Sequence, residues 1–251
     1  MPASFEEDLA AYAAAGVRGI GVCEFKLPPD GRRLLRESGL SATACVPTVP
    51  SILPLPPMEG PADPAERVEA LCASVGRLAE LEPACVLFLT GPGEAERDVV
   101  LDGIQRIAAA GEEAGVHVAL EPVHPSQRDA FSFVNSIAEA LALLDEAGTP
   151  GVGLLVDTWH VGAIGVAAAA GRIYGVHVSD RREPTRNLFD RLLPGDGVLP
   201  LAEILEAIAG TGYEGWYDVE IFSDEAFPDS LWRVEPAELA RRACESMERL
   251  P

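Results

Sequence analysis

GVGLLVDTWH, at residues 151–160, is the stretch that decides the fold. Its first half is an uncharged apolar run, too short for a helix and bounded by proline and glycine, which is typical of a fully buried parallel strand. Its second half turns polar, so Asp157 and His160 lie where such a strand would leave the core. Because α/β folds keep their chemistry at the carboxyl ends of strands, this stretch predicts a functional strand end.

Helical and strand patterns alternate along the whole chain. Apolar runs predict strands at residues 19–25, 41–48, 84–90, 116–121, 152–157, 173–179 and 216–222. Helical spacing of apolar residues predicts helices at residues 4–16, 28–38, 64–80, 94–114, 134–147, 161–170, 199–208 and 236–250. Seven strands alternating with eight helices predict an α/β fold, a (β/α)8 TIM barrel formed by a single domain at residues 1–251.

The chain begins on a helix, so we expect the first strand of an eight-stranded barrel to be missing from it. An unpaired strand edge at that place would favour self-association into a homo-oligomer. The alternative fold is an open doubly wound sheet, but no GxGxxG motif follows an early strand and the sequence has no P-loop motif. A proline-rich loop at residues 47–64 leaves a predicted strand end, which is a common position for an active-site lid.

The composition favours small-molecule chemistry. The 40 acidic and 19 basic residues give a net charge of −21, which repels nucleic acids and anionic membranes. Five cysteines occur without a CxxC pair, as is typical of reduced thiols in the cytoplasm. The first residues are acidic where a signal peptide would be basic, and no apolar segment reaches membrane-spanning length. We therefore expect a cytoplasmic protein with no nucleic-acid or membrane partner.

Polar side chains gather at the predicted strand ends. Four of them could bind one metal ion: Glu121, Asp157, His177 and Glu220, with His124, His160 and Asp180 just beyond. Because the carboxyl ends of barrel strands converge on one mouth, ligands from different strands can surround a single ion. Three carboxylates and one imidazole suit Mn²⁺, Mg²⁺, Co²⁺ or Fe²⁺ better than the sulfur-rich sites of structural zinc. The site requires His177 and Glu220 to point inward.

These residues also have structural interpretations. Asp157 by itself fits the N-cap of a following helix better than a ligand. However, three of the four histidines fall at predicted strand ends on one rim, which a random scatter would rarely produce. His117 starts its strand on the opposite rim and Asp180 fits a loop cap, so we interpret both as supporting residues. Glu24 could cap, bind substrate or be solvated, and Trp159 fits packing better than stacking on a substrate.

Five segments carry a resemblance to a known family. They are ALEPVHP (119–125), GLLVDTWH (153–160), YGVHVSD (174–180), DRLLPGDGVLPL (190–201) and GYEGWYDVEIF (212–222). In that order they resemble the metal-glutamate strand, the Asp-x-x-His strand, the metal-histidine strand, the arginine loop and the final metal-glutamate strand of the xylose isomerase-like TIM barrels in the sugar phosphate isomerase/epimerase group. The spacing from His177 to Arg191 resembles the inosose isomerase branch more than the ketose 3-epimerases.

The resemblance implies one divalent metal ion, Mn²⁺ first, with Mg²⁺, Co²⁺, Fe²⁺ or Zn²⁺ as alternatives. Its implied ligands are Glu121, Asp157, His177 and Glu220. It also implies that His160 and Arg191 contact substrate oxygens, with His124 and Lys26 as further candidates for substrate binding. The family barrel begins with a strand that this sequence lacks.

The constellation predicts a reaction that begins with proton abstraction next to a carbonyl. An ion held by two adjacent substrate oxygens polarises the carbonyl and stabilises a metal-bound enediolate. Glu121 and Glu220 would move protons as an acid/base pair, while His160 and Arg191 would hold the oxyanion. We therefore expect a metal-dependent isomerase or epimerase of a keto-sugar or keto-inositol. A non-phosphorylated polyol fits best, because the arginines of the loop at residues 180–197 lie among acidic residues.

Other functions start from the same fold. A lyase or dehydratase, or a subunit of a C-glycoside deglycosidase, could use the same metal site. A nuclease acting at abasic sites is disfavoured, because it would need a cluster of zinc ions and a basic surface. A non-catalytic sugar-binding relative is disfavoured by the complete set of metal-binding side chains.

Overall fold

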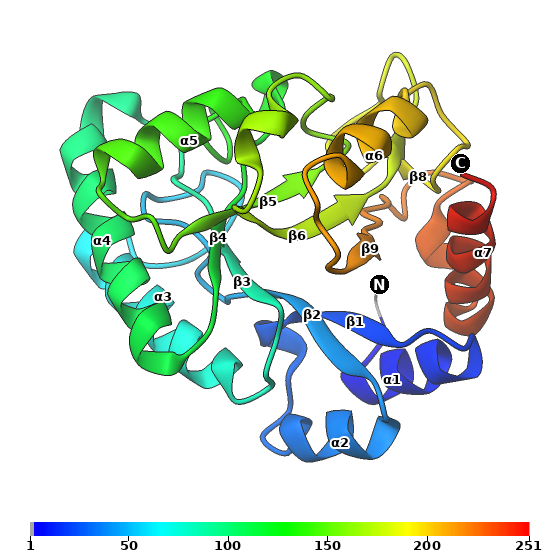
Figure 1. Cartoon of the computed structure of the whole chain (residues 1–251). Helices are drawn as coiled ribbons and strands as arrows, with labels where there is room; N and C mark the ends of the chain where they lie inside the picture. The colour runs from blue at the N-terminus through cyan, green and yellow to red at the C-terminus, as the bar shows by residue number, and fades with distance from the viewer. Residues whose placement is uncertain (1–2, 251) are drawn as a thin grey trace.

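A computed structural model of the protein describes residues 3–250. Figure 1 shows its strands curled around a central axis, with the helices outside them. The α-helices are α1 Phe5–Ala14, α2 Gly31–Ser38, α3 Pro64–Ala79, α4 Arg97–Ala114, α5 Ile137–Glu146, α6 Leu201–Ala209 and α7 Pro236–Glu248. The strands are β1 Gly19–Cys23, β2 Ser41–Val46, β3 Cys85–Phe88, β4 Val118–Leu120, β5 Gly153–Asp157, β6 Ile173–Val178, β7 Asp180–Arg181, β8 Arg191–Leu192 and β9 Tyr217–Val219.

Seven of the strands form one parallel sheet within the described residues. Their order in the sheet is their order in the chain: β1, β2, β3, β4, β5, β6 and β9. A doubly wound sheet would reverse its strand order at a switch point, so the open-sheet alternative is wrong. The prediction of a TIM-barrel fold with seven strands is confirmed.

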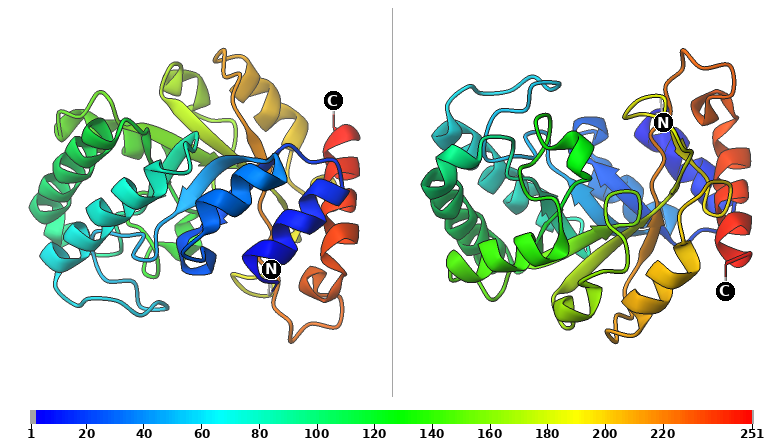
Figure 2. Two further views of the ribbon diagram at one scale, coloured as in Figure 1. Left: turned by 90° about the horizontal axis from the view of Figure 1, so that it is seen from below. Right: turned by 90° about the horizontal axis from the view of Figure 1, so that it is seen from above.

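The edge strands β1 and β9 come together, although no strand ladder joins them within residues 3–250. Trp216, directly before β9, packs against Gly19 at the start of β1, where an added Cβ would lie 3.0 Å from the indole ring. Outside these strands α1 packs against α7, as both views in Figure 2 show. The barrel is therefore nearly closed, by an indole on the inside and by a helix pair on the outside.

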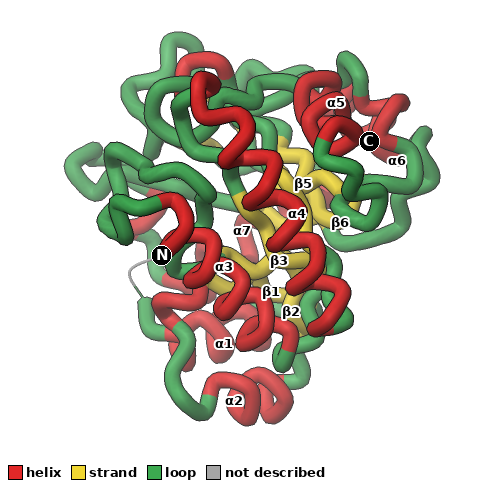
Figure 3. Tube along the Cα trace, turned by 90° about the vertical axis from the view of Figure 1, so that its left-hand side faces the viewer, coloured by secondary structure: helices red, strands yellow, loops and turns green. Residues whose placement is uncertain are grey.

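Alternation along the strands separates two apolar layers. The larger layer lies between strands and helices, where Val86 and Phe88 of β3 point outward. Figure 3 shows α3 and α4 covering this outer side of the strands. The smaller layer fills the barrel interior and consists of Ala44, Cys85, Leu87, Ala119 and Leu155. The central strands β2 to β6 thus bury both faces, which explains their continuous apolar runs in the sequence.

Local signals set the helix ends. The Ser4 hydroxyl accepts a hydrogen bond from the Glu7 N–H, and the Glu7 carboxylate accepts one from the Ser4 N–H, which forms a capping box at α1. Gly39 and Gly115 end α2 and α4 in the left-handed conformation, with φ of 75° and 67°. No helix within residues 3–250 has both the length and the apolar character that crossing a bilayer requires.

Two segments differ from the sequence prediction. The helix expected at residues 161–170 is wrong, because only Val166–Ala169 form a single 3-10 turn. Gly165 adopts φ 85° directly before it, and such a glycine interrupts the helix that the alanines favour. The polar loop expected at residues 180–197 contains the antiparallel ribbon of β7 and β8, a pairing that no local pattern indicated.

A buried arginine anchors the proline-rich loop. The Arg67 side chain, which is 1% exposed, donates from Nε to the Ser51 carbonyl at 3.1 Å and from Nη2 to the Ser51 hydroxyl at 2.7 Å. Its Nη1 donates to the Pro61 carbonyl at 3.0 Å. Both ends of the loop are therefore fixed to α3, and Ile52 and Leu53 between them are buried in the core.

Candidate active site

Four polar side chains from four strand ends meet at the mouth of the barrel. Glu121 follows β4, Asp157 ends β5, His177 lies in β6 and Glu220 follows β9. One ligand atom of each lies within 4.8 Å of every other. Three of the four are buried and Glu220 is half-buried. The structure thus brings together the residues that the sequence singled out as ligands, and their metal binding stays a prediction.

Strand pairing places these side chains. Asp157 and His177 are register partners across β5 and β6, so their side chains leave the same face of the sheet. The Glu220 N–H donates to the Val178 carbonyl at 3.1 Å, which extends the pairing of β6 with β9 by one residue. His177 Nδ1 lies 3.3 Å from Glu220 Oε1. Both side chains therefore point into the barrel mouth, as a shared metal site requires.

A buried arginine joins the cluster from β8. Arg191 Nη1 donates to Asp157 Oδ2 at 2.6 Å, lies 2.7 Å from Glu220 Oε2 and is 3.3 Å from the Ser179 hydroxyl. The other carboxylate oxygen of Asp157 accepts from the Trp159 N–H at 2.8 Å. Asp157 therefore caps the turn that follows β5 and also faces the cluster, so the two interpretations of this residue do not exclude each other.

Burial and charge set the protonation of the cluster. Burial raises the pKa of Glu121 to about 8, and the charges of Glu220 and Asp157 act in the same direction. Burial lowers the pKa of His177, but the charge and close contact of Glu220 together with the charges of Glu121 and Asp157 outweigh burial and raise this pKa to about 10. Glu220 is desolvated as well, yet His177 and Arg191 hold its pKa below the ordinary range. Without a cation, Glu121 and His177 are thus both protonated at pH 7.

His160 is buried beside the cluster. Its Nδ1 accepts a hydrogen bond from the His124 N–H at 3.1 Å. Burial lowers the pKa of His160 to about 4, so the ring is neutral at pH 7. A neutral ring that accepts at Nδ1 carries its proton on Nε2, which lies 3.3 Å from Arg191 Nη2 and 3.6 Å from Asp157 Oδ2. That proton is placed to donate to an oxygen in the barrel mouth.

The four clustered residues fit a divalent cation. Three carboxylates and one imidazole supply the mixed oxygen and nitrogen shell that such ions take. His177 Nδ1 is buried and makes no well-aligned hydrogen bond with the described residues. Burial and the neighbouring carboxylates raise the pKa of Glu121, and a positive ion would stabilise its ionised form and give the unsatisfied nitrogen of His177 a partner.

Comparison with known proteins places the chain in a family. The Xylose isomerase-like TIM barrel family model matches residues 9–250. The chain belongs to this family. Within the xylose isomerase-like TIM barrels, an inosose dehydratase from Geobacillus thermodenitrificans is 25% identical over 172 residues, which cover 60% of this chain and 56% of the relative.

Two further relatives of this xylose isomerase-like barrel are named as an isomerase and an epimerase. An inosose isomerase from Halalkalibacterium halodurans is 31% identical over 123 residues, which cover 45% of this chain and 42% of the relative. An L-ribulose 3-epimerase from Mesorhizobium japonicum is 27% identical over 134 residues, which cover 51% of this chain and 41% of the relative. The chain therefore spans about half the length of the curated relatives that it matches.

Solved structures match almost the whole xylose isomerase-like barrel. A protein from Sinorhizobium meliloti 1021 is 28% identical with a TM-score of 0.86, over 98% of this chain and 93% of that chain. The IOLI protein, solved with a bound zinc atom, is 19% identical with a TM-score of 0.79, over 98% of this chain and 92% of that chain. The second likeness shows the shared fold.

Three other residues named from the sequence contact neighbours outside the cluster. The Lys26 ammonium pairs with the buried Asp8 carboxylate of α1. The Glu24 carboxylate accepts from the Thr48 N–H and from Arg77, which makes Glu24 a structural brace. His117 stacks on Tyr174 with ring centroids 4.3 Å apart, at the far end of β6 from His177.

Asp180 holds the ribbon that carries Arg191 in this xylose isomerase-like barrel. Its buried carboxylate accepts hydrogen bonds from the backbone N–H groups of Arg181, Gly195, Gly197 and Leu199, at 2.7 to 3.1 Å. An added Cβ at Gly197 would collide with the backbone carbonyl of Arg181 at 2.5 Å, so only glycine fits this turn. Asp180 is thus a supporting residue of the loop, in agreement with its expected role.

The sequence assigned no place at the barrel mouth to Arg181, whereas the packing expected for Trp159 is confirmed, because its side chain is 2% exposed. Arg181 is the register partner of Arg191 across β7 and β8. The guanidinium carbons of Arg181 and Arg191 lie 5.5 Å and 5.7 Å from the centroid of the same Trp159 ring. In a strand every second side chain lies on the same face, so His177, Ser179 and Arg181 would share the inward face. This signal was not used, because residues 180–197 were expected to form a loop.

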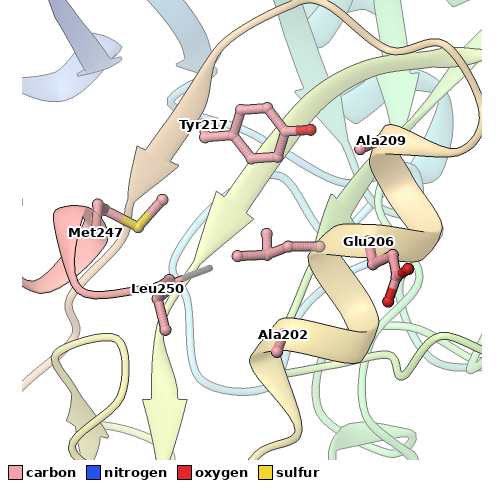
Figure 4. Close-up of a pocket in the computed structure, with 7 residues that line it drawn as sticks. Ala202, Glu206, Ala209, Tyr217, Met247 and Leu250 are labelled. Carbon is pink, nitrogen blue, oxygen red and sulfur yellow. The ribbon is translucent and has the colours of Figure 1, made fainter.

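Figure 4 shows a hollow on the outer side of β9. Its volume is about 560 Å³, and it lies between α6 and the end of the chain after α7. Tyr217 borders it from β9, with Met247 and Leu250 on one side and Ala202 and Glu206 on the other. None of its lining residues belongs to the cluster, so this hollow is separate from the candidate active site of the xylose isomerase-like barrel.

Proposed function

We propose that this protein is a divalent-metal-dependent isomerase or epimerase of a sugar-like ketone, either a keto-sugar or a keto-inositol. The observation that carries the proposal is the convergence of Glu121, Asp157, His177 and Glu220 within 4.8 Å at the barrel mouth. The names of the inosose and ketose relatives support the substrate class. The proposal treats residues 1–251 as one domain that works in the cytoplasm on a small molecule.

The four clustered side chains would hold one divalent ion. A bound ion acts as a Lewis acid that polarises a substrate carbonyl. The donor set favours Mn²⁺, Mg²⁺, Co²⁺ or Fe²⁺, while the zinc bound to the structurally similar IOLI protein keeps Zn²⁺ in the set to be tested. Asp157 and His177, which are fully buried and paired in register, would fix the position of the ion.

Glu121 and Glu220 would transfer the proton. They come from β4 and β9, with β5 and β6 between them in the sheet, so they approach a bound substrate from different sides. The low pKa of Glu220 keeps it ionised and able to accept a proton from the substrate. Glu121, whose own proton a bound metal ion would displace, would be the second carboxylate that can accept or return a proton from its side. Removal of a proton next to the carbonyl gives an enediolate, and protonation at another position or face gives the isomer or epimer.

His160 and Arg191 would hold the negative charge that develops on the substrate oxygen. The Nε2–H of His160 and the guanidinium of Arg191 lie 3.3 Å apart, so both can donate to one oxygen. Arg191 is held by Asp157 and Glu220, which fixes its planar donor group before substrate binds. His124 supports His160 by donating its backbone N–H to Nδ1.

The alternative reactions differ in the step that follows proton abstraction. Elimination of a hydroxyl from the same enediolate would make the protein a dehydratase, which the inosose dehydratase relative supports. Cleavage of an oxidised C-glycoside would also begin with this proton transfer. A sugar-binding protein without turnover would have no use for a cluster of three carboxylates and one imidazole at the barrel mouth.

A product screen tests the proposal. Purified protein is incubated with Mn²⁺, Mg²⁺, Co²⁺ or Zn²⁺ and with keto-sugars, keto-inositols and oxidised C-glycosides, and products are identified by NMR. We expect an isomer or epimer of at least one ketone. A dehydrated product would establish the lyase alternative, a released sugar the deglycosidase alternative, and unchanged compounds with every metal would contradict enzymatic function.

A further inference from the structure

Arg181 lies beside the candidate active site. It pairs with Arg191 across the antiparallel ribbon of β7 and β8, and directly opposed residues of such a ribbon project from the same face. Arg191 reaches Asp157 at 2.6 Å from that face. Both guanidinium groups also lie within 6 Å of the Trp159 ring. Arg181 is therefore a neighbour of Arg191 at the barrel mouth.

The charge of Arg181 is not matched by a carboxylate among residues 3–250. Its loop neighbours Arg182 and Arg186 both pair with Asp190 and Asp229, at 2.5 to 3.2 Å. Arg181 makes no such ion pair within the described residues, and its buried Nε has no hydrogen-bond partner there. In a chain with 40 acidic and 19 basic residues, this arrangement is unexpected.

This arrangement is unfavourable for folding. Like charges directly opposite each other on a ribbon repel, and a buried N–H without an acceptor loses its hydration. The Trp159 ring offsets part of this cost, because the face of the indole attracts the Arg181 guanidinium in a cation–π contact. Asp190, which is 2% exposed, neutralises Arg182 and Arg186 but does not pair with Arg181. An anion from outside the chain would satisfy the remaining donors.

Two further groups border the same place. The Trp159 indole is 2% exposed, and its Nε1–H has no acceptor within the described part of the chain. The His124 ring lies edge-on to Trp159 at 5.5 Å between centroids. His124 and Arg181 thus both contact the Trp159 ring, and burial together with the charge of Arg181 lowers the pKa of His124.

We propose that Arg181, with Trp159 and His124, binds a carboxylate on the substrate, so that the substrate class is an acidic keto-sugar. This inference rests on the proposed function, because it places the carboxylate on the molecule whose carbonyl lies at the four-residue cluster. One unpaired guanidinium matches the planar, singly charged carboxylate. A doubly charged phosphate would need further cations, and Arg182 and Arg186 are already neutralised.

The inference narrows the expectation of a non-phosphorylated polyol to one that carries a carboxylate. That expectation assumed that acidic residues neutralise all the arginines of the loop at residues 180–197. The structure bears this out for Arg182, Arg186 and Arg191, whose partners are Asp190, Asp229, Asp157 and Glu220. Arg181, in contrast, is not neutralised by an acidic residue within the described part of the chain.

Binding measurements test the subsite without relying on turnover. Isothermal titration calorimetry is carried out on the full chain with Mn²⁺, using alditols, the aldonates of the same carbon number and the matching alditol phosphates. We expect an aldonate to bind at least about 10-fold more tightly than its alditol and its phosphate ester. The Arg181→Gln variant should weaken aldonate binding by about 10- to 100-fold and leave alditol binding unchanged.

Two variants control for folding and net charge. Arg181→Lys keeps the positive charge and should retain part of the preference for aldonates. Arg36→Gln removes an exposed positive charge in α2 and should change nothing. Equal binding of aldonate and alditol, tighter binding of the phosphate ester, or a preference that persists in Arg181→Gln would overturn the carboxylate subsite.

Deuterium exchange on neutral ketoses and on keto acids distinguishes this inference from the proposed function. Exchange on neutral ketoses combined with no Arg181-dependent binding of aldonates would overturn the subsite and leave the proposed function standing. Arg181-dependent binding of aldonates without exchange on any ketone would support the subsite and contradict the proposed function.

Discussion

Asp157 and Arg191 form a buried ion pair in the barrel mouth, with Arg191 Nη1 2.6 Å from Asp157 Oδ2. The two residues are 34 positions apart, and the same arginine nitrogen lies 2.7 Å from Glu220 Oε2. Arg191 therefore ties together two carboxylates that arrive on β5 and after β9. The geometry of the cluster therefore depends on this residue of β8.

Arg191→Lys should lower the rate of proton transfer while keeping the fold. Lysine retains the positive charge but cannot hold two carboxylates and an oxyanion with one planar group. We expect kcat/KM for the substrate found in the screen to fall by about 100-fold, with the melting temperature nearly unchanged. A rate equal to that of the wild type would show that Arg191 serves only as a counter-charge.

Metal binding at pH 7 should release about two protons. The pKa of Glu121 is about 8 and that of His177 about 10 in the metal-free site, so both carry a proton that a metal ion must displace. Apparent affinity should therefore rise with pH across this range. Mn²⁺ titration by calorimetry in buffers of different ionisation enthalpy counts the protons.

Glu121→Gln serves as the control for proton release. The amide has no proton to lose, so this variant should release about one proton, from His177. If the wild-type protein binds Mn²⁺ without releasing protons, the two side chains are not ligands in the protonation states described.

Glu24→Gln should destabilise the fold at neutral pH. Burial alone would raise the pKa of Glu24, but hydrogen bonds from the Thr48 N–H, Ser74 and Arg77 hold it below the ordinary value. A carboxylate with a lowered pKa stabilises the folded state above its unfolded pKa of about 4.3, and this stabilisation is lost as the pH falls through the folded pKa.

We therefore expect the Glu24→Gln free energy of unfolding to be about 1 kcal/mol lower at pH 7, with the difference shrinking below about pH 4. Urea denaturation at both pH values measures this change. The exposed Glu69→Gln in α3 is the matched control and should have no effect at either pH. A pH-independent loss in Glu24→Gln would assign the effect to packing.

Much of the fold could be predicted because the central strands β2 to β6 bury both faces. The runs around Val86 and Leu155 are apolar without interruption, since one face meets helices and the other fills the barrel. The positions of Asp157 and His177 followed from the rule that parallel strands end at one rim. The helix at residues 161–170 was wrong because the alanine pattern outweighed Gly165.

The contacts of the loop residues could not be predicted in the same way. Arg181 and Arg191 face each other only because β7 pairs with β8, and that pairing is held by the Asp180 carboxylate through backbone N–H groups. Lys26 was a candidate for substrate contact, yet its pairing with Asp8 depends on how α1 packs, which local sequence does not encode.

Solvent deuterium exchange tests the central claim most directly. The metal-loaded protein is incubated with ketoses, keto-inositols and keto acids in D₂O, and deuterium at the carbon next to the carbonyl is measured by mass spectrometry. We expect incorporation by the wild type, and loss of that incorporation in both Glu121→Gln and Glu220→Gln. Undiminished incorporation in both variants would contradict the assignment of these two carboxylates as the acid/base pair.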